Sequence, residues 1–453
     1  MFLKIFLLGV IFNYMDLCFG EPQTSTVSDN IGVYKSCFED LGCIETTAEW
    51  FHRTHRPRNL EPLDRHTIRT EFILITKDVD ETKPLNYDIV FARKESLSLS
   101  GYKKDKGLIL LIHDFTSNGR TGWVKHIVTS LTTKLNIVSV DWEAGAEPPF
   151  EQAIANARVV ALEIKAFVEA VQDGCTPHPI HIISHGVGAH IAGYVGSYVN
   201  VTKITGLDPT GPLFENMPPV VRLDPTDATY VEVLHTDAFN SRSQGAKTRL
   251  GHIDFFFNGA LLQPQCNQSN EYPVFTKLDR NTLKEGVILP ACSHKRSFKY
   301  YIEALQSNEC EFTGIGCTSY TDFAEGKCTS CGSENNKSNC ATFGTSVTTL
   351  VTHTRSLYLN TRGEPPYCLN SYSVKIHFEN NVKAKKFQEG SFELIMINEK
   401  GVMINATASY VGIKKHTHRF ESGKTKTLVY YATEPRIVVV QEARLKWLHT
   451  QLH

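Results

Sequence analysis

Apolar and polar residues alternate in blocks between residues 70 and 300, and the blocks have the lengths of strands and helices. Short apolar runs bounded by turn residues predict buried strands at 70–76, 106–115, 135–142, 179–185 and 203–209. Apolar side chains at helical spacing predict helices at about 150–171 and at 188–199. This alternation predicts a mostly parallel sheet covered on both faces, with reactive groups at the carboxyl ends of its strands.

The pattern changes after Cys340, where short segments of alternating polarity follow one another, separated by Gly, Asn and Lys. They lie at 371–380, 390–401, 426–433 and 436–443. Such segments predict a small antiparallel β-sandwich. The two prolines of "RGEPPYC" break the chain between the parts, so we expect a large α/β domain at 21–365 and a sandwich at 366–453.

The first residues, "MFLKIFLLGVIFNYMDLCFG", combine an early lysine, an apolar run and a small residue at Gly20. This order is typical of a secretory signal peptide at 1–20, and the apolar run is too short for a membrane span. A buried N-terminal strand is the alternative. No later segment is apolar for long enough to cross a bilayer, so we expect a secreted, extracellular protein without a transmembrane segment.

Cysteine spacing agrees with secretion. Of twelve cysteines, Cys18 leaves with the signal peptide, and the close pairs Cys37/Cys43, Cys317/Cys328 and Cys331/Cys340 suit small disulfide loops in an oxidising compartment. A zinc site at "CTSC" is the competing interpretation. Glycosylation sequons stand at Asn200, Asn267, Asn336 and Asn405.

The net charge argues against nucleic acid binding. With 453 residues and a formal net charge of −1, the chain offers no basic surface of the kind that nucleic acid binding requires. The local run Lys414–His416 is typical of a solvated face. No organic cofactor is indicated.

The stretch "SHGVGAHIAG" carries the candidate chemistry. A nucleophile elbow is a sharp strand-to-helix turn with small residues around its centre, and Gly188, Ala189 and Gly193 meet that need. The expected G-x-S-x-G pattern has glycine, Gly186, where the serine would stand. Glycine tolerates the backbone angles of the elbow but has no side chain to attack with.

From Cys37 onward the sequence resembles the pancreatic lipase family. The resemblance rests on "SCFEDLGC", "VDWEAGA", "SHGVGAHIAG", "ITGLDPTGPLF", "VRLDPTDATYVEVLHTD", "GHIDFFFNGALLQPQC" and "ACSHKRSFKYY", in family order. It implies an α/β-hydrolase fold with a mostly parallel central sheet, followed by an antiparallel β-sandwich of the PLAT type.

The resemblance assigns two of three catalytic positions. Asp208 matches the triad aspartate and His294 the triad histidine, but the serine position is Gly186, so the two partners have nothing to activate. Ser184 could replace the serine only if the motif were shifted by two residues, with Ile182 where a small residue belongs. Asp208 and His294 as ordinary structural residues are the alternative.

A second departure concerns the oxyanion hole. The resemblance implies backbone donors at Phe115 and Val187, but the family's H-G-F reads His113-Asp114-Phe115. A carboxylate that faces the place of an oxyanion is electrostatically adverse. The two departures together suggest relaxed selection.

The resemblance also implies a lid and a calcium site. Cys266 and Cys292 match the cysteines that bracket the lid, with a plain disulfide loop as the alternative. Asp224 and Asp227 match carboxylate ligands of calcium, and Pro219 and Arg222 match positions that contribute backbone carbonyls. A turn capped by the two aspartates is the alternative.

We therefore expect a secreted lipase-like protein that lacks the usual hydrolase mechanism and acts through lipid, a lipid–water interface or a protein partner of its C-terminal domain. That domain looks shorter than its family counterpart and ends in "RLKWLHTQLH" in place of the usual last strand and cysteine pair. The alternative is an active triacylglycerol lipase or phospholipase that uses another nucleophile, or a water held by His294.

Overall fold

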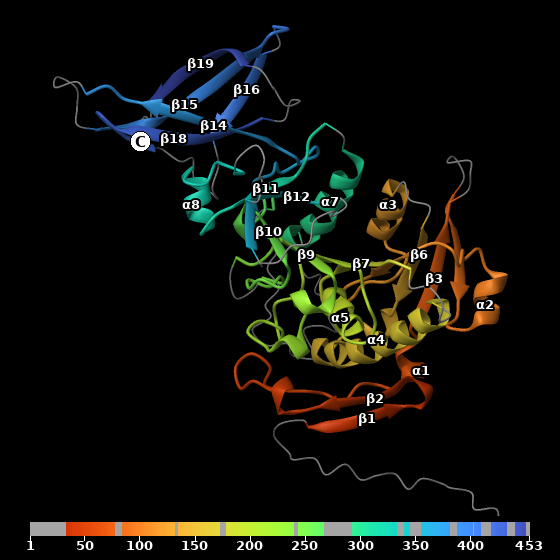
Figure 1. Ribbon diagram of the computed structural model, residues 1–453. Helices are drawn as coiled ribbons and strands as arrows, with labels where there is room; N and C mark the ends of the chain where they lie inside the picture. The colour runs from red at the N-terminus through yellow and green to blue at the C-terminus, as the bar shows by residue number, and fades with distance from the viewer. Residues whose placement is uncertain are drawn as a thin grey trace, which may run out of the picture.

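A large twisted sheet forms the centre of the protein in a computed structural model (Figure 1). The structure describes residues 33–77, 84–131, 135–172, 178–239, 243–266, 292–307, 309–332, 339–344, 355–380, 387–401, 403–408, 418–432 and 440–449. Within these residues eleven strands join in the order β12-β11-β13-β10-β9-β8-β7-β5-β6-β3-β4. Their bounds are β3 Glu71–Thr76, β4 Asn86–Val90, β5 Leu108–Ile112, β6 Asn136–Asp141, β7 Ile180–His185, β8 Lys203–Leu207, β9 Tyr230–His235, β10 Ile253–Phe257, β11 Thr313–Gly316, β12 Cys340–Thr342 and β13 Arg355–Leu359.

The middle of the sheet is parallel and its margins are antiparallel. Neighbouring strands run parallel from β6 through β5, β7, β8, β9 and β10 to β13. The strands β3 and β4 at one margin, and β11 and β12 at the other, pair antiparallel. Every residue of β5 and β6 is buried, as a sheet covered on both faces requires.

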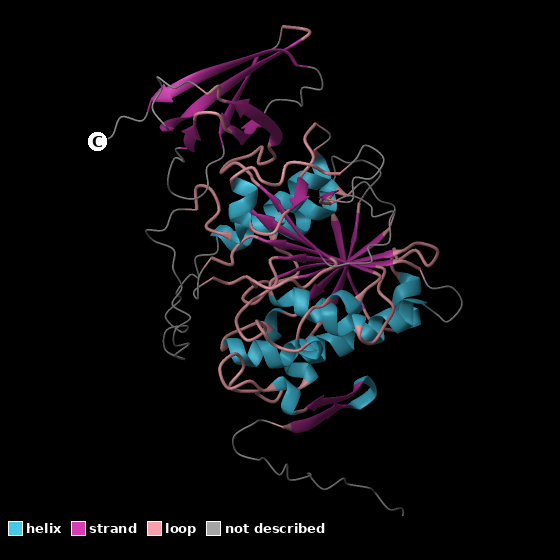
Figure 2. Cartoon of the chain, turned by 60° about the vertical axis from the view of Figure 1, so that its left-hand side comes forward, coloured by secondary structure: helices cyan, strands magenta, loops and turns pink. Residues whose placement is uncertain are grey.

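Helices cover both faces of the sheet (Figures 1 and 2). On one face α4 (Phe150–Gln172) and α5 (Val187–Gly196) bury their apolar sides against the core that contains Leu110 and Ile182. On the other face α3 (Gly122–Ser130) and α7 (Cys292–Gln306) pack over Ile109 and Ile183. Strand residues next to each other in sequence therefore belong to opposite cores, which is the period of two that a strand imposes.

An N-terminal hairpin lies outside the sheet, against α4. Its strands are β1 (Tyr34–Phe38) and β2 (Gly42–Thr46), joined at the Cys37–Cys43 disulfide. Arg158 of α4 donates to the Thr46 hydroxyl and the Glu45 carbonyl, both at 2.7 Å. Its guanidinium also lies 3.7 Å from the ring centre of Trp50. A buried arginine thus ties this hairpin to the main domain.

The C-terminal region forms a separate antiparallel assembly, drawn in blue in Figure 1. Six strands are described: β14 Asn370–His377, β15 Phe387–Asn398, β16 Met403–Ala408, β17 His418–Glu421, β18 Thr425–Ala432 and β19 Val440–His449. Side chains of β15, β16, β17 and β18 share one core, with Tyr430 and Ala406 at its centre. This arrangement is consistent with the predicted β-sandwich.

The fold class predicted from the sequence is confirmed, with one correction at the end of the chain. The segment that holds "RLKWLH" was expected to lack a strand, but it lies in β19, which pairs with β15 from Asn398↔Val440 to Gly390↔His449. Charged residues alternate there with apolar ones, and Trp447 packs on Phe392 while Lys446 approaches Glu393. This alternation is itself typical of a strand, but the charges set the segment apart from the apolar strands of the large sheet.

Disulfide bonds cross-link the described parts of the chain. Cys37–Cys43, Cys266–Cys292, Cys317–Cys328 and Cys331–Cys340 are the pairs expected above, and a further bridge joins Cys310 to Cys368. Cys331 is thus in a disulfide, contrary to a zinc ligand in "CTSC". Cys175 and the expected signal peptide lie outside the described residues. In the part of the chain that is described, no helix has the length and apolar character to cross a bilayer.

Candidate active site

The turn at Gly186 joins β7 to α5 in a backbone conformation that side chains rarely adopt. Gly186 has φ 56° and ψ −119°, and its amide is bonded to the Leu207 carbonyl. Two residues on, a Cβ at Gly188 would lie 2.6 Å from the Ile112 carbonyl oxygen, so only glycine lets α5 approach β5 this closely. The local geometry is that of the sharp turn predicted from the sequence.

Neighbouring strands bring the other predicted residues to the same edge. Strands β5, β7 and β8 lie side by side, and Asp114, Gly186 and Asp208 follow their carboxyl ends. His294 comes from the first turn of α7, on the face that this helix covers. The convergence expected at the carboxyl edge of a parallel sheet is therefore present.

Asp208 and His294 form a buried hydrogen-bonded pair. Nδ1 of His294 donates to Oδ2 of Asp208 over 2.6 Å, and the two residues are 2% and 0% exposed, respectively. Oδ1 of Asp208 accepts from the amides of Thr236 and Asp237 at 2.7 and 3.1 Å. The aspartate is thus held by the backbone, and it directs Nε2 of the imidazole toward the Gly186 turn.

The carboxylate of Asp114 fills the space in front of Gly186. Oδ2 of Asp114 lies 3.0 Å from Nε2 of His294, and Oδ1 accepts from the Val187 amide at 2.7 Å. A Cβ built on Gly186 would lie 2.1 Å from Cγ of Asp114, well inside van der Waals contact. Aspartate at 114 and any side chain at 186 therefore compete for the same volume.

Asp114 and His294 stabilise each other's charged form. Burial opposes charge on Asp114, but the hydrogen bond and positive charge of His294 outweigh it and lower the pKa of the carboxyl. Burial likewise opposes charge on His294, while its bonds to Asp114 and Asp208 raise the pKa of the imidazole. The carboxylate does face inward, and its adverse charge is offset by an imidazolium between two carboxylates.

His185 is a participant that the sequence analysis did not single out. It ends β7, is 5% exposed, and its ring lies 4.3 Å from that of His294. Burial, and then the charge of His294, lower its pKa to about 4, so the ring is neutral at physiological pH. Its position directly before the glycine of the turn, at the carboxyl end of a strand, is the signal that could have revealed it.

The hydroxyl proposed as a substitute nucleophile points elsewhere. Ser184 is fully buried within β7, and its Oγ lies 3.4 Å from the Thr205 carbonyl of the neighbouring strand. Nε2 of His294, the atom that would activate a hydroxyl, is bonded to Asp114. Of the two expected oxyanion donors, the Val187 amide is bonded to Asp114, and Phe115 is buried against Phe150.

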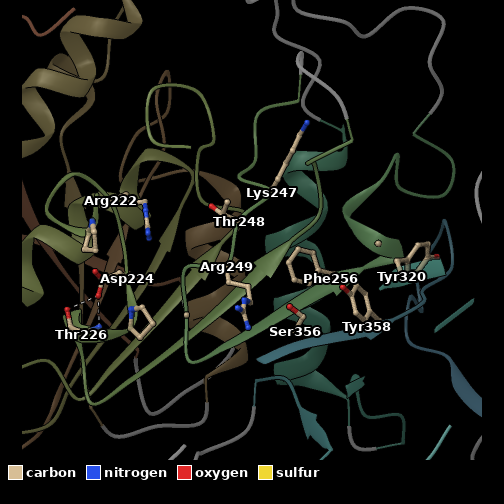
Figure 3. A pocket seen from close by; sticks show the side chains of 14 residues that line it. Arg222, Asp224, Thr226, Lys247, Thr248, Arg249, Phe256, Tyr320, Ser356 and Tyr358 are labelled. Atoms are coloured by element: carbon tan, nitrogen blue, oxygen red, sulfur yellow. Dashed lines mark hydrogen bonds between the residues drawn. The ribbon is translucent and has the colours of Figure 1, made fainter. Parts of the chain in front are cut away.

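Three of the four residues implied in a calcium site line an open hollow of about 830 Å³ (Figure 3). Pro219, Arg222 and Asp224 face this hollow, whereas Asp227 turns one oxygen toward Gly193 of α5. Asp224 accepts from the Thr226 amide and hydroxyl, and Asp227 accepts from the Asp224 amide at 2.8 Å. The donor types suit calcium, but the turn itself already engages both carboxylates, as the capping alternative requires.

The remaining predicted positions are distributed over the surface or fall outside the described residues. Asn200 is exposed after α5, and Asn405 is exposed on β16. Asn267, Asn336 and the expected lid between Cys266 and Cys292 lie outside the described residues.

Comparison with known proteins places this chain in a family. The family model "Lipase" matches residues 34–367. Pancreatic triacylglycerol lipase of Myocastor coypus is 36% identical over 307 residues, covering 66% of this chain and 65% of the relative. The human enzyme is 36% identical over 305 residues, with 65% and 64% covered. Pancreatic lipase-related protein 2 of Mus musculus is 34% identical over 312 residues, with 66% and 63% covered.

The chain therefore belongs to the lipase family. The matched region spans a little under two thirds of the length of these curated relatives.

Proposed function

We propose that this chain is a secreted lipase-family protein that does not cleave esters through a serine and instead binds lipid at a lipid–water interface. The observation that carries the proposal is the Asp114 carboxylate beside Gly186, bonded to both His294 Nε2 and the Val187 amide. The base that would activate a nucleophile and a donor that would hold the oxyanion are thus both engaged. The lipase names of the relatives support lipid as the ligand class.

Secretion is part of the same proposal. The disulfides of the described residues support it, because stable disulfides form in oxidising compartments. The first twenty residues also have the pattern that is typical of a signal peptide. The exposed Asn200 and Asn405 are the described positions at which we expect glycans.

Covalent labelling tests the loss of the serine mechanism. The full chain is treated with a serine-reactive fluorophosphonate, and adducts are counted by intact mass spectrometry. We expect no adduct on the unmodified chain or on Asp114→Gly, and an adduct on the double variant Asp114→Gly/Gly186→Ser. An adduct on the unmodified chain would contradict the proposal.

Hydrolysis by another nucleophile is the second candidate, favoured by the retained Asp208–His294 pair. We expect no release of fatty acid from triacylglycerol or phospholipid emulsions. Release that disappears in His294→Gln would establish this candidate and overturn inactivity.

Lipid association is measured separately from chemistry. We expect the full chain to float with a triacylglycerol emulsion coated with phosphatidylcholine, and a lipid extract of the secreted protein to contain bound lipid. If the chain neither floats with the emulsion nor carries bound lipid, lipid binding is ruled out. Binding of a protein partner by the C-terminal region would then remain, because it does not depend on lipid.

Calcium is proposed as a structural ion held by Asp224, Asp227 and the carbonyls of Pro219 and Arg222. Binding to the folded state alone would stabilise it by about 2.7 kcal/mol at a concentration 100 times Kd. We expect EGTA to lower the melting temperature of the unmodified chain and to leave Asp224→Asn unchanged. Equal melting curves with and without EGTA would support the capped turn without an ion.

A further inference from the structure

Three side chains at the Gly186 turn carry atoms that bind transition metals. Asp114, His185 and His294 place one carboxylate oxygen and two ring nitrogens within 4.8 Å of one another. In the part of the chain that is described, this is the one such cluster of three. We propose that Asp114, His185 and His294 form a binding site for a divalent cation of the zinc class, which goes beyond the lipid-binding function.

The distances are close to those of a coordination sphere. Nε2 of His294 lies 3.0 Å, and Nδ1 of His185 3.9 Å, from Oδ2 of Asp114. Ligand atoms of a tetrahedral zinc ion lie about 3.3 Å apart, given bonds of roughly 2.0–2.1 Å. The hydrogen bond between His294 and Asp114 explains the first distance without a metal. It does not explain why a second imidazole faces the same oxygen beyond hydrogen-bond distance.

Neighbouring groups orient both imidazoles for this role. Asp208 accepts from Nδ1 of His294 at 2.6 Å, which leaves Nε2 as the ligand atom. The His294 carbonyl lies 3.4 Å from Nε2 of His185, which leaves Nδ1 toward Asp114. A carboxylate or carbonyl behind each histidine is the usual outer sphere of a protein-bound metal. The ring of His185 also packs against Phe298 and Trp123, which stack on each other.

The ligands also come from rigid parts of the fold. Asp114 follows β5, His185 ends β7, and His294 lies in the first turn of α7. The carboxylates of Asp114 and Asp208 lie on either side of the His294 ring, so a divalent ion that takes the place of the Nε2 proton of His294 has negative charge close to it. That proton leaves to solvent, and the nitrogen lone pair binds the ion. A water completes four ligands.

Zinc retention tests the site directly. The purified full chain and its variants are loaded with ZnCl₂, desalted and analysed by mass spectrometry for zinc per chain, and affinities are measured by competition with a chromogenic chelator. We expect one zinc in this site of the unmodified chain. His185→Gln and Asp114→Asn should each weaken that affinity by at least about tenfold, and Asp208→Asn by about 10–100-fold.

Controls separate this site from other histidines and from misfolding. His55→Gln, in the pair His52–His55 with rings 4.4 Å apart, removes a histidine of the N-terminal region and should leave the affinity unchanged. Cobalt in place of zinc should give visible ligand-field bands that change in His185→Gln, with circular dichroism showing that the variants are folded. No bound zinc, or equal affinity in His185→Gln, Asp114→Asn and the unmodified chain, would overturn the proposal.

Discussion

At the scale of single residues, Asp114 and Gly186 are matched to each other. The carboxylate of Asp114 occupies the volume that a Cβ at 186 would need, and it bonds to His294 and the Val187 amide. The two departures from the family pattern, which the sequence analysis attributed to relaxed selection, therefore form one interlocking unit. A site whose polar groups are mutually satisfied is stable without a substrate.

This interlock predicts strong coupling between the two positions. Gly186→Ser should lower the free energy of unfolding by about 1–3 kcal/mol, because the new side chain meets Asp114. In an Asp114→Gly background the same change should cost less, with a coupling energy of about 0.5–3 kcal/mol. Urea unfolding of the four members of this double-mutant cycle measures the coupling. Equal costs in both backgrounds would mean that the side chains do not compete.

The charged state of His294 gives a pH prediction. Burial opposes its charge, but the bonds to Asp114 and Asp208 raise its pKa to about 10, above the unfolded value of about 6.5. Stability from this imidazolium is therefore complete below about pH 6.5 and is lost as pH rises through about 10.

The measurement is the difference in unfolding free energy between the unmodified chain and Asp114→Asn. Asp114 has a lowered pKa, so its own contribution is present above about pH 4 and is lost in stronger acid. We expect the difference to be largest between about pH 4 and 6.5 and to shrink toward pH 10. A nitrogen NMR spectrum that shows a neutral His294 ring at pH 8 would contradict the raised pKa of this histidine.

Sequence predicted part of this site. The turn at Gly186 could be recognised from its local pattern of small residues, and Asp208 and His294 from the resemblance of their motifs to those of the family. The contact between Asp114 and position 186 could not, because it depends on how β5 lies beside β7 and on a side-chain rotamer. The position of His185 before the turn glycine could have marked it as close to the site, but its contact with His294 depends on how α7 lies over β7.

At the scale of elements, α4 is anchored to the N-terminal hairpin by Arg158. The guanidinium satisfies Thr46 and the Glu45 carbonyl and packs on Trp50. We expect Arg158→Ala to lower the free energy of unfolding by about 2–4 kcal/mol, from lost charged hydrogen bonds and the lost cation–π contact. Denaturant unfolding measures the change.

Lys165→Ala is the matched control on the same helix. Lys165 forms a surface pair with Glu169 at 3.6 Å, which should be worth less than about 0.5 kcal/mol. Similar losses for Arg158→Ala and Lys165→Ala would show that the hairpin is not held by the buried arginine.

Element prediction succeeded where burial produces uniform apolar runs and failed where charges interrupt them. The strands at β5, β6, β7 and β8 were predicted because both faces are covered. Strand β19 was missed at its end because Glu442, Arg444 and Lys446 lie on it, and residues 440–446 are all exposed, so no buried apolar face marks the strand there.

At the scale of the whole molecule, α7 also fixes the segment that joins the large sheet to the C-terminal sheet. Glu303 of α7 accepts from the amides of Tyr367 and Cys368 at 2.8 and 2.7 Å, and Arg296 donates to the Gly363 carbonyl at 2.6 Å. The Cys310–Cys368 disulfide closes the same region. The helix that carries His294 therefore holds the start of the C-terminal sheet as well.

The disulfides should differ in their effect on stability according to the loop that each closes. Cys310 and Cys368 are 58 residues apart, and chain entropy gives about 4 kcal/mol for a loop of this length. Cys37 and Cys43 are 6 apart, which gives about 2 kcal/mol. Each cysteine pair is replaced by serines in turn, and the melting temperature is measured by thermal unfolding. We expect a larger decrease when the pair that closes the longer loop is replaced. The reverse order would contradict this.

The crowding of Asp114 against position 186 also sets the order in which mutations could restore hydrolysis. A serine that arises first at 186 meets the carboxylate and destabilises the fold before it yields any activity. A glycine that arises first at 114 clears the space but supplies no nucleophile. Neither substitution alone would be favoured by selection. Under the proposed function, the change from an enzyme to a binding protein is therefore difficult to reverse by single mutations.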